Sequence, residues 1–223
     1  MKNETSANKE AVILCALVGW YVIVSQLLPR SGFFRHTPLS LWIQTINYII
    51  LGVFFLIAFR TLIRDGIDQW RQYAGKNLLW LIGAFAADMV LSNLANFPLA
   101  RFYPDYVSVN DNSVMEAAAL LPASLLLISF GIFGPVTEEF IFRILPVEKG
   151  KRAPVSIKII AASLLFMAVH MHEITIQELL YNLGMFVTGI IYAIALIKTK
   201  NVTIPILIHV LNNAPALLLL LVG

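Results

Sequence analysis

Long apolar runs separated by short polar segments make up most of the chain. A membrane-spanning helix needs about 17–25 predominantly apolar residues. Seven runs reach or approach that length, at positions 11–28, 39–59, 78–97, 114–133, 157–171, 179–197 and 202–221. The fifth run is short as drawn, and we expect its helix to begin earlier, just after Pro154. The pattern predicts an all-α fold, a polytopic transmembrane helical bundle of seven spans, or of eight if the chain breaks at Gly134-Pro135.

The chain shows no long linker, low-complexity tract or internal repeat, so we expect residues 1–223 to form a single transmembrane domain. The first run does not resemble a cleaved signal peptide. Its apolar stretch is longer than the usual ~7–15 residues, the charges before it are mixed, and no A-x-A cleavage site follows. We expect it to remain as a transmembrane helix.

Composition supports a membrane protein, since 59% of the residues are hydrophobic and only 13% are charged. Soluble domains carry roughly 25% charged residues. These values exclude a disordered chain and a soluble globule. The one cysteine, Cys15, excludes a disulfide framework or a cysteine-rich zinc site within one chain.

The basic residues lie mainly in alternate loops. With the N-terminus in the cytoplasm, all of the 16 Lys and Arg residues except Arg30, Arg35 and Arg101 fall on the cytoplasmic side. The positive-inside rule therefore predicts a cytoplasmic N-terminus, in a bacterial plasma membrane. Topology also explains the net charge of +3 without nucleic acid as a partner.

Ionisable residues within membrane spans are costly and are candidate functional groups. In GPVTEEFIFRILP, Glu139 and Arg143 are four residues apart and can pair on one helix face. Glu138 is rotated by about 100° from Glu139 and is left available as a base. The alternative is a juxtamembrane cluster with an ordinary ion pair. Asp88 lies in another span, and the sequence assigns it no role.

Two further segments combine histidine with a residue four positions away. Phe166 and His170 share one helix face, although a lone histidine there can equally be a packing residue, and His172 nearby is a substitute. His209 and Asn213 share a face of a helix that is otherwise apolar, with Asn212 adjacent. Their alternative role is an interhelical hydrogen-bonded pair.

Taken together, Glu138-Glu139-x-x-x-Arg143, Phe166-x-x-x-His170 and His209-x-x-x-Asn213 resemble, in order and spacing, the three motifs of the CAAX protease and bacteriocin-processing (Abi) family of intramembrane endopeptidases. This family includes the type II CAAX prenyl endopeptidase. The resemblance covers about residues 134–215, within a family-like core of about 114–221. Gly184, Gly189 and Thr203-Ile-Pro agree with it.

The resemblance implies a peptidase that uses a glutamate to activate water. Glu138 would be the general base, and His170 would hold the water. His209 and Asn213 would form the oxyanion site, while Glu139 and Arg143 would order the first motif. A base and oxyanion donors of these types suit a site with little water, and no Ser or Cys stands beside a histidine as a nucleophile.

The sequence leaves a metal site open as an alternative. Glu138, His170 and His209 could supply a carboxylate and two imidazoles to zinc, although the chain has no HExxH motif. The preferred interpretation, a peptidase that activates water with a glutamate, requires no cofactor.

We expect an enzyme that cuts a peptide or small protein on the cytoplasmic half of the bilayer, in peptide or bacteriocin maturation or in self-immunity. Helix arithmetic does not place the motifs at one depth unless the fifth span is strongly tilted or begins as an interfacial segment. The alternative is a non-catalytic immunity or scaffold protein that binds a peptide partner. A carrier that titrates Asp88 and Glu138 ranks last, because no inverted repeat is present.

Overall fold

The computed structural model describes residues 16–28, 31, 37–149 and 153–222, and within them the regular elements are all helices. The all-α prediction is therefore confirmed. Cys15, Arg30, Arg35 and the expected start of the first span at residue 11 lie outside the described residues.

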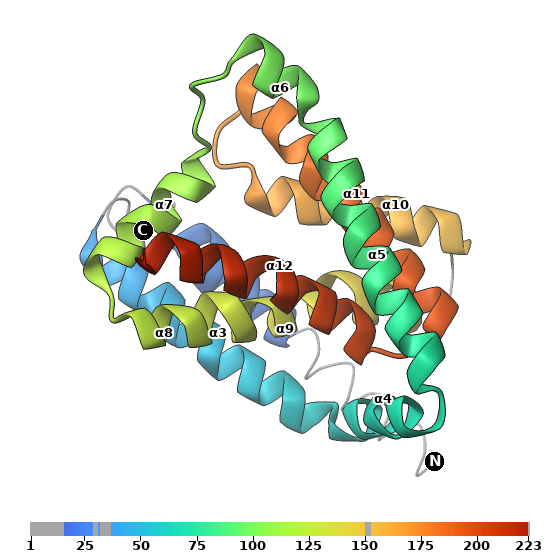
Figure 1. The fold of residues 1–223 in the computed structure, drawn as a ribbon. Helices are drawn as coiled ribbons and strands as arrows, with labels where there is room; N and C mark the ends of the chain where they lie inside the picture. Colours follow the sequence, from blue (N-terminus) through green and yellow to red (C-terminus); the bar gives the residue numbers. More distant parts are fainter. Residues whose placement is uncertain (1–15, 29–30, 32–36, 150–152, 223) are drawn as a thin grey trace.

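Most of the predicted apolar runs are helices in the structure (Figure 1). A first helix, Ala16–Leu27, includes the π-helical segment η1 (Tyr21–Leu27). It is followed by α3 (Pro38–Ala58), α5 (Ala74–Ala95), α10 (Val155–His170), α11 (Ile176–Thr199) and α12 (Thr203–Val222). As expected, α10 begins directly after Pro154. In the described part of the chain five helices are long and apolar enough to cross a membrane, and two shorter apolar helices accompany them. The total of seven or eight spans stays a prediction.

The fourth predicted span is placed differently. Residues 114–133 divide between α7 (Val109–Leu120) and a continuous helix that begins after Pro122. The chain turns there because Leu121, which precedes the proline, is extended (ψ 149°). The continuous helix comprises α8 (Ala123–Ile128), the π-helical η2 (Ser129–Phe133), α9 (Gly134–Glu139) and the π-helical η3 (Phe140–Lys149).

The break at Gly134-Pro135, the alternative that would have added an eighth span, does not occur; the helix instead continues past Pro146. The N–H of Gly134 donates to the carbonyl of Ser129, five residues earlier. This wider turn stands directly before Pro135, where an α-helical turn would clash with the proline ring. The helix therefore passes through Pro135 and carries the first motif in its middle.

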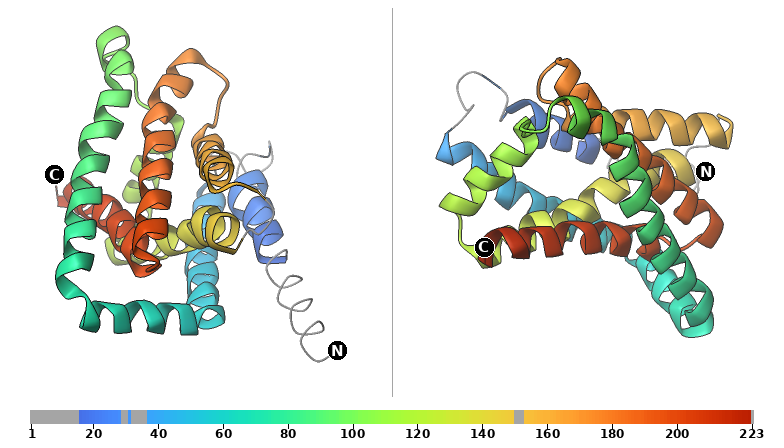
Figure 2. Two further views of the ribbon diagram at one scale, coloured as in Figure 1. Left: turned by 90° about the vertical axis from the view of Figure 1, so that its right-hand side faces the viewer. Right: turned by 45° about the horizontal axis from the view of Figure 1, so that its top comes forward.

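Two helices have no counterpart in the predicted spans. The polar α4 (Arg60–Gln72) lies across the ends of α3 and α5, and the short α6 (Phe97–Phe102) lies at the far end of α5 (Figure 2). Asn201 donates to the carbonyl of Gly66 at 3.1 Å and so fastens α4 to the α11–α12 connection. A Cβ at Gly66 would lie 2.6 Å from Oδ1 of Asn201, so only glycine permits this approach.

The helix that carries His170, α10, crosses its neighbour α11 at a large angle (Figure 2). α5 and α11 run side by side, whereas α10 crosses α11 steeply (Figures 1 and 2). A Cβ at Gly189 would lie 2.8 Å from Cβ of Ser163, so this glycine lets α10 and α11 touch through their backbones. The steep course of α10 removes the problem of depth, because it brings the end of α10 to the middle of the bundle.

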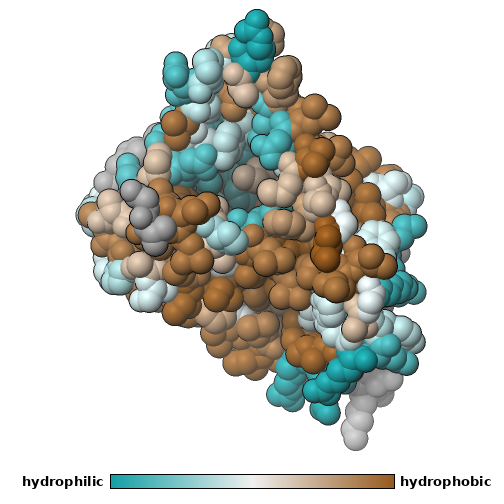
Figure 3. Space-filling view, in the orientation of Figure 1, coloured by the Kyte–Doolittle hydropathy of each residue, from teal (hydrophilic) through white to brown (hydrophobic). Residues whose placement is uncertain are grey.

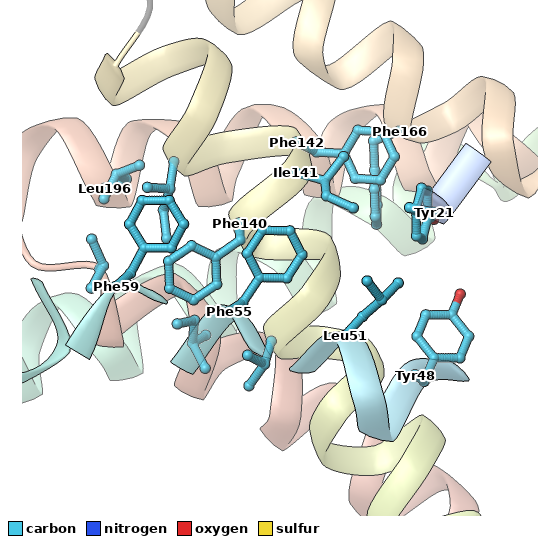
Figure 4. Packing of buried hydrophobic residues seen from close by; sticks show 14 residues of the cluster. Tyr21, Tyr48, Leu51, Phe55, Phe59, Phe140, Ile141, Phe142, Phe166 and Leu196 are labelled. Carbon is cyan, nitrogen blue, oxygen red and sulfur yellow. The ribbon is translucent and has the colours of Figure 1, made fainter. Parts of the chain in front are cut away.

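A stack of aromatic rings fixes the helix that carries the two glutamates (Figure 4). The ring of Phe140 lies 5.2 Å from that of Phe55 with an interplanar angle of 3°. The ring of Phe59 also stacks against that of Phe140, at 4.9 Å, and lies 6.2 Å from that of Phe55. Since Phe140 directly follows Glu139, these contacts with α3 hold both carboxylates in place.

The surface separates into apolar and polar regions (Figure 3). Hydrophobic residues form a broad middle region, and hydrophilic residues gather on α4 and around a hollow between α6, α7 and α11. This distribution fits a protein embedded in a bilayer, with an opening at the end away from α4.

Candidate active site

A cavity of about 890 Å³ enters the bundle at the end opposite α4. Its wall includes Pro38, Ser92 and Leu220, which belong to the ends of α3, α5 and α12 that lie away from α4, and much of α7. No residue of α4 lines it. Glu138, His170 and His209 lie in its wall.

Glu138 occupies the wall with one oxygen held and the other directed at two imidazoles. Its side chain is nearly buried, with 7% exposed. Oε1 accepts a hydrogen bond from the hydroxyl of Tyr48 at 3.1 Å. Oε2 lies 3.7 Å from Nε2 of His209 and 4.0 Å from Nε2 of His170. These two gaps are too long for direct hydrogen bonds and are of the kind that a water molecule bridges.

Glu139 points to the other side of the helix, as its spacing predicts. It is fully buried, and Oε1 lies 3.2 Å from Nη1 of Arg143, which is itself 1% exposed. The guanidinium also lies over the ring of Phe166, 3.9 Å from its centroid. The predicted Glu139–Arg143 pair is therefore present, and it is buried rather than juxtamembrane.

His170 is oriented by its own helix. Nδ1 lies 2.7 Å from the carbonyl oxygen of Phe166. Since a carbonyl oxygen only accepts, Nδ1 carries a proton and Nε2 is the nitrogen that faces Glu138. The ring of Phe166 packs on the rings of both His170 and His209, at 4.5 and 5.9 Å between centroids. Phe166 is thus the packing surface on which both histidines and Arg143 rest.

His209 joins the two glutamates. Nδ1 lies 2.9 Å from Oε1 of Glu139, and Nε2 faces Glu138. The carboxylate of Glu139 accepts a hydrogen bond from Nδ1–H and so fixes the orientation of the ring. The three motifs therefore meet in space, although they are distant in sequence.

The two asparagines of α12 separate. Asn213 lines the cavity and donates to the carbonyl of Phe130 at 3.3 Å. Asn212 instead donates to Asp88 and to the hydroxyl of Tyr192. Among the described residues Asn213 forms no hydrogen bond with Glu138 or His209. Asn213 shares the cavity with them, and its role as an oxyanion donor stays a prediction.

Asp88, which had no predicted role, lies in the wall of the same cavity and is 1% exposed. It accepts hydrogen bonds from Thr188 at 2.6 Å, from Tyr192 at 2.9 Å and from Asn212. The ring of Tyr192 lies 5.5 Å from that of His209. Asp88 is thus connected to the motif residues through one tyrosine.

Sequence reasoning missed Tyr48, Tyr192 and Glu178. A tyrosine within an apolar helix gives no signal of its own, because it is as much a packing residue as a hydrogen-bond donor. Glu178 is fully buried and accepts from the hydroxyl of Tyr106 at 2.7 Å and from the N–H of Val109 at 2.9 Å. Burial of this hydroxyl, with the adjacent Glu178 carboxylate, raises the pKa of Tyr106 to about 12. These bonds hold the start of α7 at the cavity mouth.

The cavity opens away from the start of the first described helix. The helix Ala16–Leu27 brings its later residues, Ser25 and Gln26, to the cavity wall. Its first residue, Ala16, therefore lies away from the cavity mouth. The expectation of a site on the cytoplasmic half stays a prediction.

The described residues contain no group of three His, Cys, Asp or Glu side chains arranged to hold a metal ion. The set considered from the sequence, Glu138, His170 and His209, does converge, with Nε2 of each imidazole turned toward Oε2 of Glu138. We derive no step through a metal.

Comparisons with known proteins place this arrangement. Residues 120–215 match the model of the family described as "Type II CAAX prenyl endopeptidase Rce1-like". The matched segment contains all three motifs. The chain is also 26% identical over 212 residues to the "Membrane-embedded CAAX protease MroQ" of Staphylococcus aureus (strain USA300), covering 86% of this chain and 82% of that protein. No solved structure matches the chain significantly. Motifs, site and matches agree: the chain is an integral membrane protein, and the segment that carries its three motifs is similar to the CAAX protease family.

Proposed function

We propose that this protein is an intramembrane endopeptidase that hydrolyses a peptide bond with a water molecule activated by Glu138. The observation that carries the proposal is the position of Oε2 of Glu138, which faces Nε2 of His209 at 3.7 Å and Nε2 of His170 at 4.0 Å in the wall of the cavity. A water between these atoms would donate one hydrogen bond to Oε2 of Glu138 and one to Nε2 of His170. Glu138 would take its proton as it attacks the substrate carbonyl.

The neighbours of Glu138 supply what the reaction needs. Tyr48 holds one oxygen of the carboxylate, so that the other keeps its direction. His170 faces the water with an unprotonated Nε2. His209 has Nδ1 bonded to Glu139, so its Nε2 donates a hydrogen bond only when the ring is protonated. The buried Glu139 carboxylate stabilises that protonated form next to a developing oxyanion.

Asn213 completes the proposed oxyanion site. Its amide has two N–H donors, one of which is directed at the carbonyl of Phe130. The second N–H is available to a substrate in the cavity that Asn213 lines. Glu139 and Arg143 act by positioning His209.

For the biological role, we propose maturation of a peptide or bacteriocin, or self-immunity against one. The cavity supports a peptide substrate, since its volume of about 890 Å³ accommodates several side chains. The matched relative is a membrane-embedded protease by its name.

We also propose an orientation. The end of the bundle that bears α4 carries most of the described basic residues: Arg60, Arg64, Arg71, Lys76, Lys198 and Lys200. The other end carries Arg101. The positive-inside rule places the α4 end, and with it the N-terminus, in the cytoplasm. The cavity mouth then faces the outside of a bacterial plasma membrane.

A cleavage assay tests the proposed activity. The wild type and the Glu138→Gln variant, each reconstituted in lipid nanodiscs, are given a fluorogenic peptide library with and without a strong chelator. The matched control is Asp65→Asn, which removes an exposed carboxylate on α4. We expect cleavage by the wild type and by the control, resistance to chelator, and loss with Glu138→Gln. Loss with chelator would favour the zinc alternative, and cleavage by Glu138→Gln would exclude Glu138 as the base.

A further inference from the structure

The described wall of the cavity combines several carboxylates with histidines but with no lysine or arginine. Four carboxylates line it, Asp88, Asp111, Glu116 and Glu138, whereas its described lining includes neither lysine nor arginine. In contrast, Glu139 faces away from the cavity and is paired with Arg143. The guanidinium of Arg143 is therefore paired with a glutamate that does not line the cavity.

Asp88 is the most deeply buried of the four. Its three hydrogen-bond donors, Thr188, Tyr192 and Asn212, are all neutral. No Lys or Arg of the described residues forms an ion pair with it. Neutral donors of this kind satisfy the oxygens of a carboxylate without bringing a positive charge to it.

Two acceptor atoms on residues of the cavity wall also lack a donor among the described residues. Oδ1 of Asn212 is buried without a hydrogen-bond partner among the described residues. Oε2 of Glu138, on a side chain that is more than nine-tenths buried, accepts no hydrogen bond and lines the cavity. Each buried acceptor of this kind gains free energy when a donor arrives.

Two further carboxylates of the cavity, Asp111 and Glu116, lie on α7 at the mouth. Both oxygens of Asp111 accept from the hydroxyl of Tyr181, at 2.8 and 2.7 Å. Glu116 follows on the same helix and is exposed. Carboxylates from the mouth to the wall beside the motif residues would attract a positively charged ligand along the whole cavity.

Apolar residues fill much of the remaining wall, among them Leu41, Met89 and Leu217. A ligand that satisfies both features has an apolar stem and a cationic end, as lysine and arginine side chains do. We propose that the cavity selects a peptide segment with a Lys or Arg side chain next to the bond to be cut, with Asp88 as the residue that binds the cation. This inference rests on the proposed peptidase function and names its substrate class.

A binding assay separates the inference from the activity. The full-length Glu138→Gln variant in nanodiscs is titrated against three fluorescein-labelled Ala/Leu peptides that differ at one central position, Lys, norleucine or Glu. Norleucine keeps the apolar stem and removes the charge. Asp88→Asn, Glu116→Gln and Asp65→Asn are each compared in this background by fluorescence anisotropy.

We expect the Lys peptide to bind about tenfold more tightly than the norleucine peptide, and the Glu peptide to bind more weakly than both. Asp88→Asn should remove most of this preference. Glu116→Gln, an exposed position where misfolding is not expected, should lower it by about two- to fivefold. Asp65→Asn, outside the cavity, should leave it unchanged.

Equal binding of the Lys and norleucine peptides, or an unchanged preference in both Asp88→Asn and Glu116→Gln, would overturn the inference. The same peptides are then given to the wild type for cleavage. Selective binding without cleavage by the wild type would contradict the peptidase function but leave the cation selectivity intact. Cleavage of all three peptides at equal rates would support the peptidase function and contradict the cation selectivity.

Discussion

Nδ1 of His209 lies 2.9 Å from Oε1 of Glu139, a contact between residues 70 positions apart in the chain. This hydrogen bond decides which ring nitrogen faces the cavity, because the carboxylate accepts a hydrogen bond from Nδ1–H and leaves Nε2 toward Glu138. The second glutamate of the motif therefore acts on the reaction only through the histidine.

Glu139→Gln tests this positioning role. The amide keeps the size of the side chain and can still accept from Nδ1, but it removes the charge that stabilises a protonated His209. We expect kcat to fall by about 10²-fold or more with little change in KM. Steady-state kinetics on a cleaved peptide measure both. A rise in KM alone, with kcat unchanged, would argue against the role.

Arg143→Ala is expected to lower the free energy of unfolding by about 3–5 kcal/mol, because it leaves Glu139 charged and buried without its partner. The matched control is Arg71→Ala, which breaks the exposed pair with Asp68 on α4 and should cost no more than about 1 kcal/mol. Unfolding followed in nanodiscs gives both values. Similar small losses in the two variants would show that the Glu139–Arg143 pair does not stabilise the fold.

Phe166→Leu should reduce both stability and kcat, since the ring supports His170, His209 and Arg143 at once. Leu165→Ala, at an exposed position of the same helix, serves as the control and should leave kcat unchanged. Kinetics and thermal unfolding of the two variants are compared side by side. A Phe166→Leu variant with normal kcat would mean that the histidines keep their positions without this ring.

Gly189→Ala should destabilise the protein by about 1–3 kcal/mol, because its Cβ would meet Cα and Cβ of Ser163 at 2.9 and 2.8 Å. Gly83→Ala meets nothing within 4 Å. In the middle of α5 it should be neutral or stabilising by up to about 1 kcal/mol. The difference in melting temperature between the Gly189→Ala and Gly83→Ala variants measures how closely α10 packs on α11. Equal melting temperatures would show that the two helices do not touch at Gly189.

Cysteine accessibility tests the orientation. In a Cys15→Ser background, Asp65→Cys places a thiol on α4 and Asp105→Cys places one at the opposite end. A membrane-impermeant maleimide added to intact cells should label the variant at 105 and not the variant at 65. Labelling at 65 alone would place the cavity mouth in the cytoplasm.

Much of the site could be predicted from the sequence because the motif pairs lie four residues apart on helices, where spacing alone puts side chains on one face. Glu139 with Arg143 and His170 with Phe166 are of this kind, and both are present. Contacts between helices carry no such spacing. Tyr48, Tyr192 and the partners of Asp88 come from three different helices and could not be found in this way.

The predicted helix boundaries were wrong where the surrounding helix overrode a local start or stop signal. Gly134-Pro135 carries the signals of a helix start, but the π-helical turn before it lets the helix continue. Leu121-Pro122, within an apolar run, is the true break. The depth at which His170 lies depends on how α10 crosses α11 (Figure 2), which helix lengths alone do not determine.

The most direct measurement is the kcat of the Glu138→Gln variant on a peptide that the wild type cuts, with peptide affinity and melting temperature measured on the same preparation. Glutamine keeps the shape of the side chain but cannot take a proton from water. We predict a fall in kcat of about 10²–10⁴-fold, with affinity and melting temperature close to those of the wild type. A variant that cuts the peptide at the wild-type rate would contradict the account, because Glu138 would then not be the base.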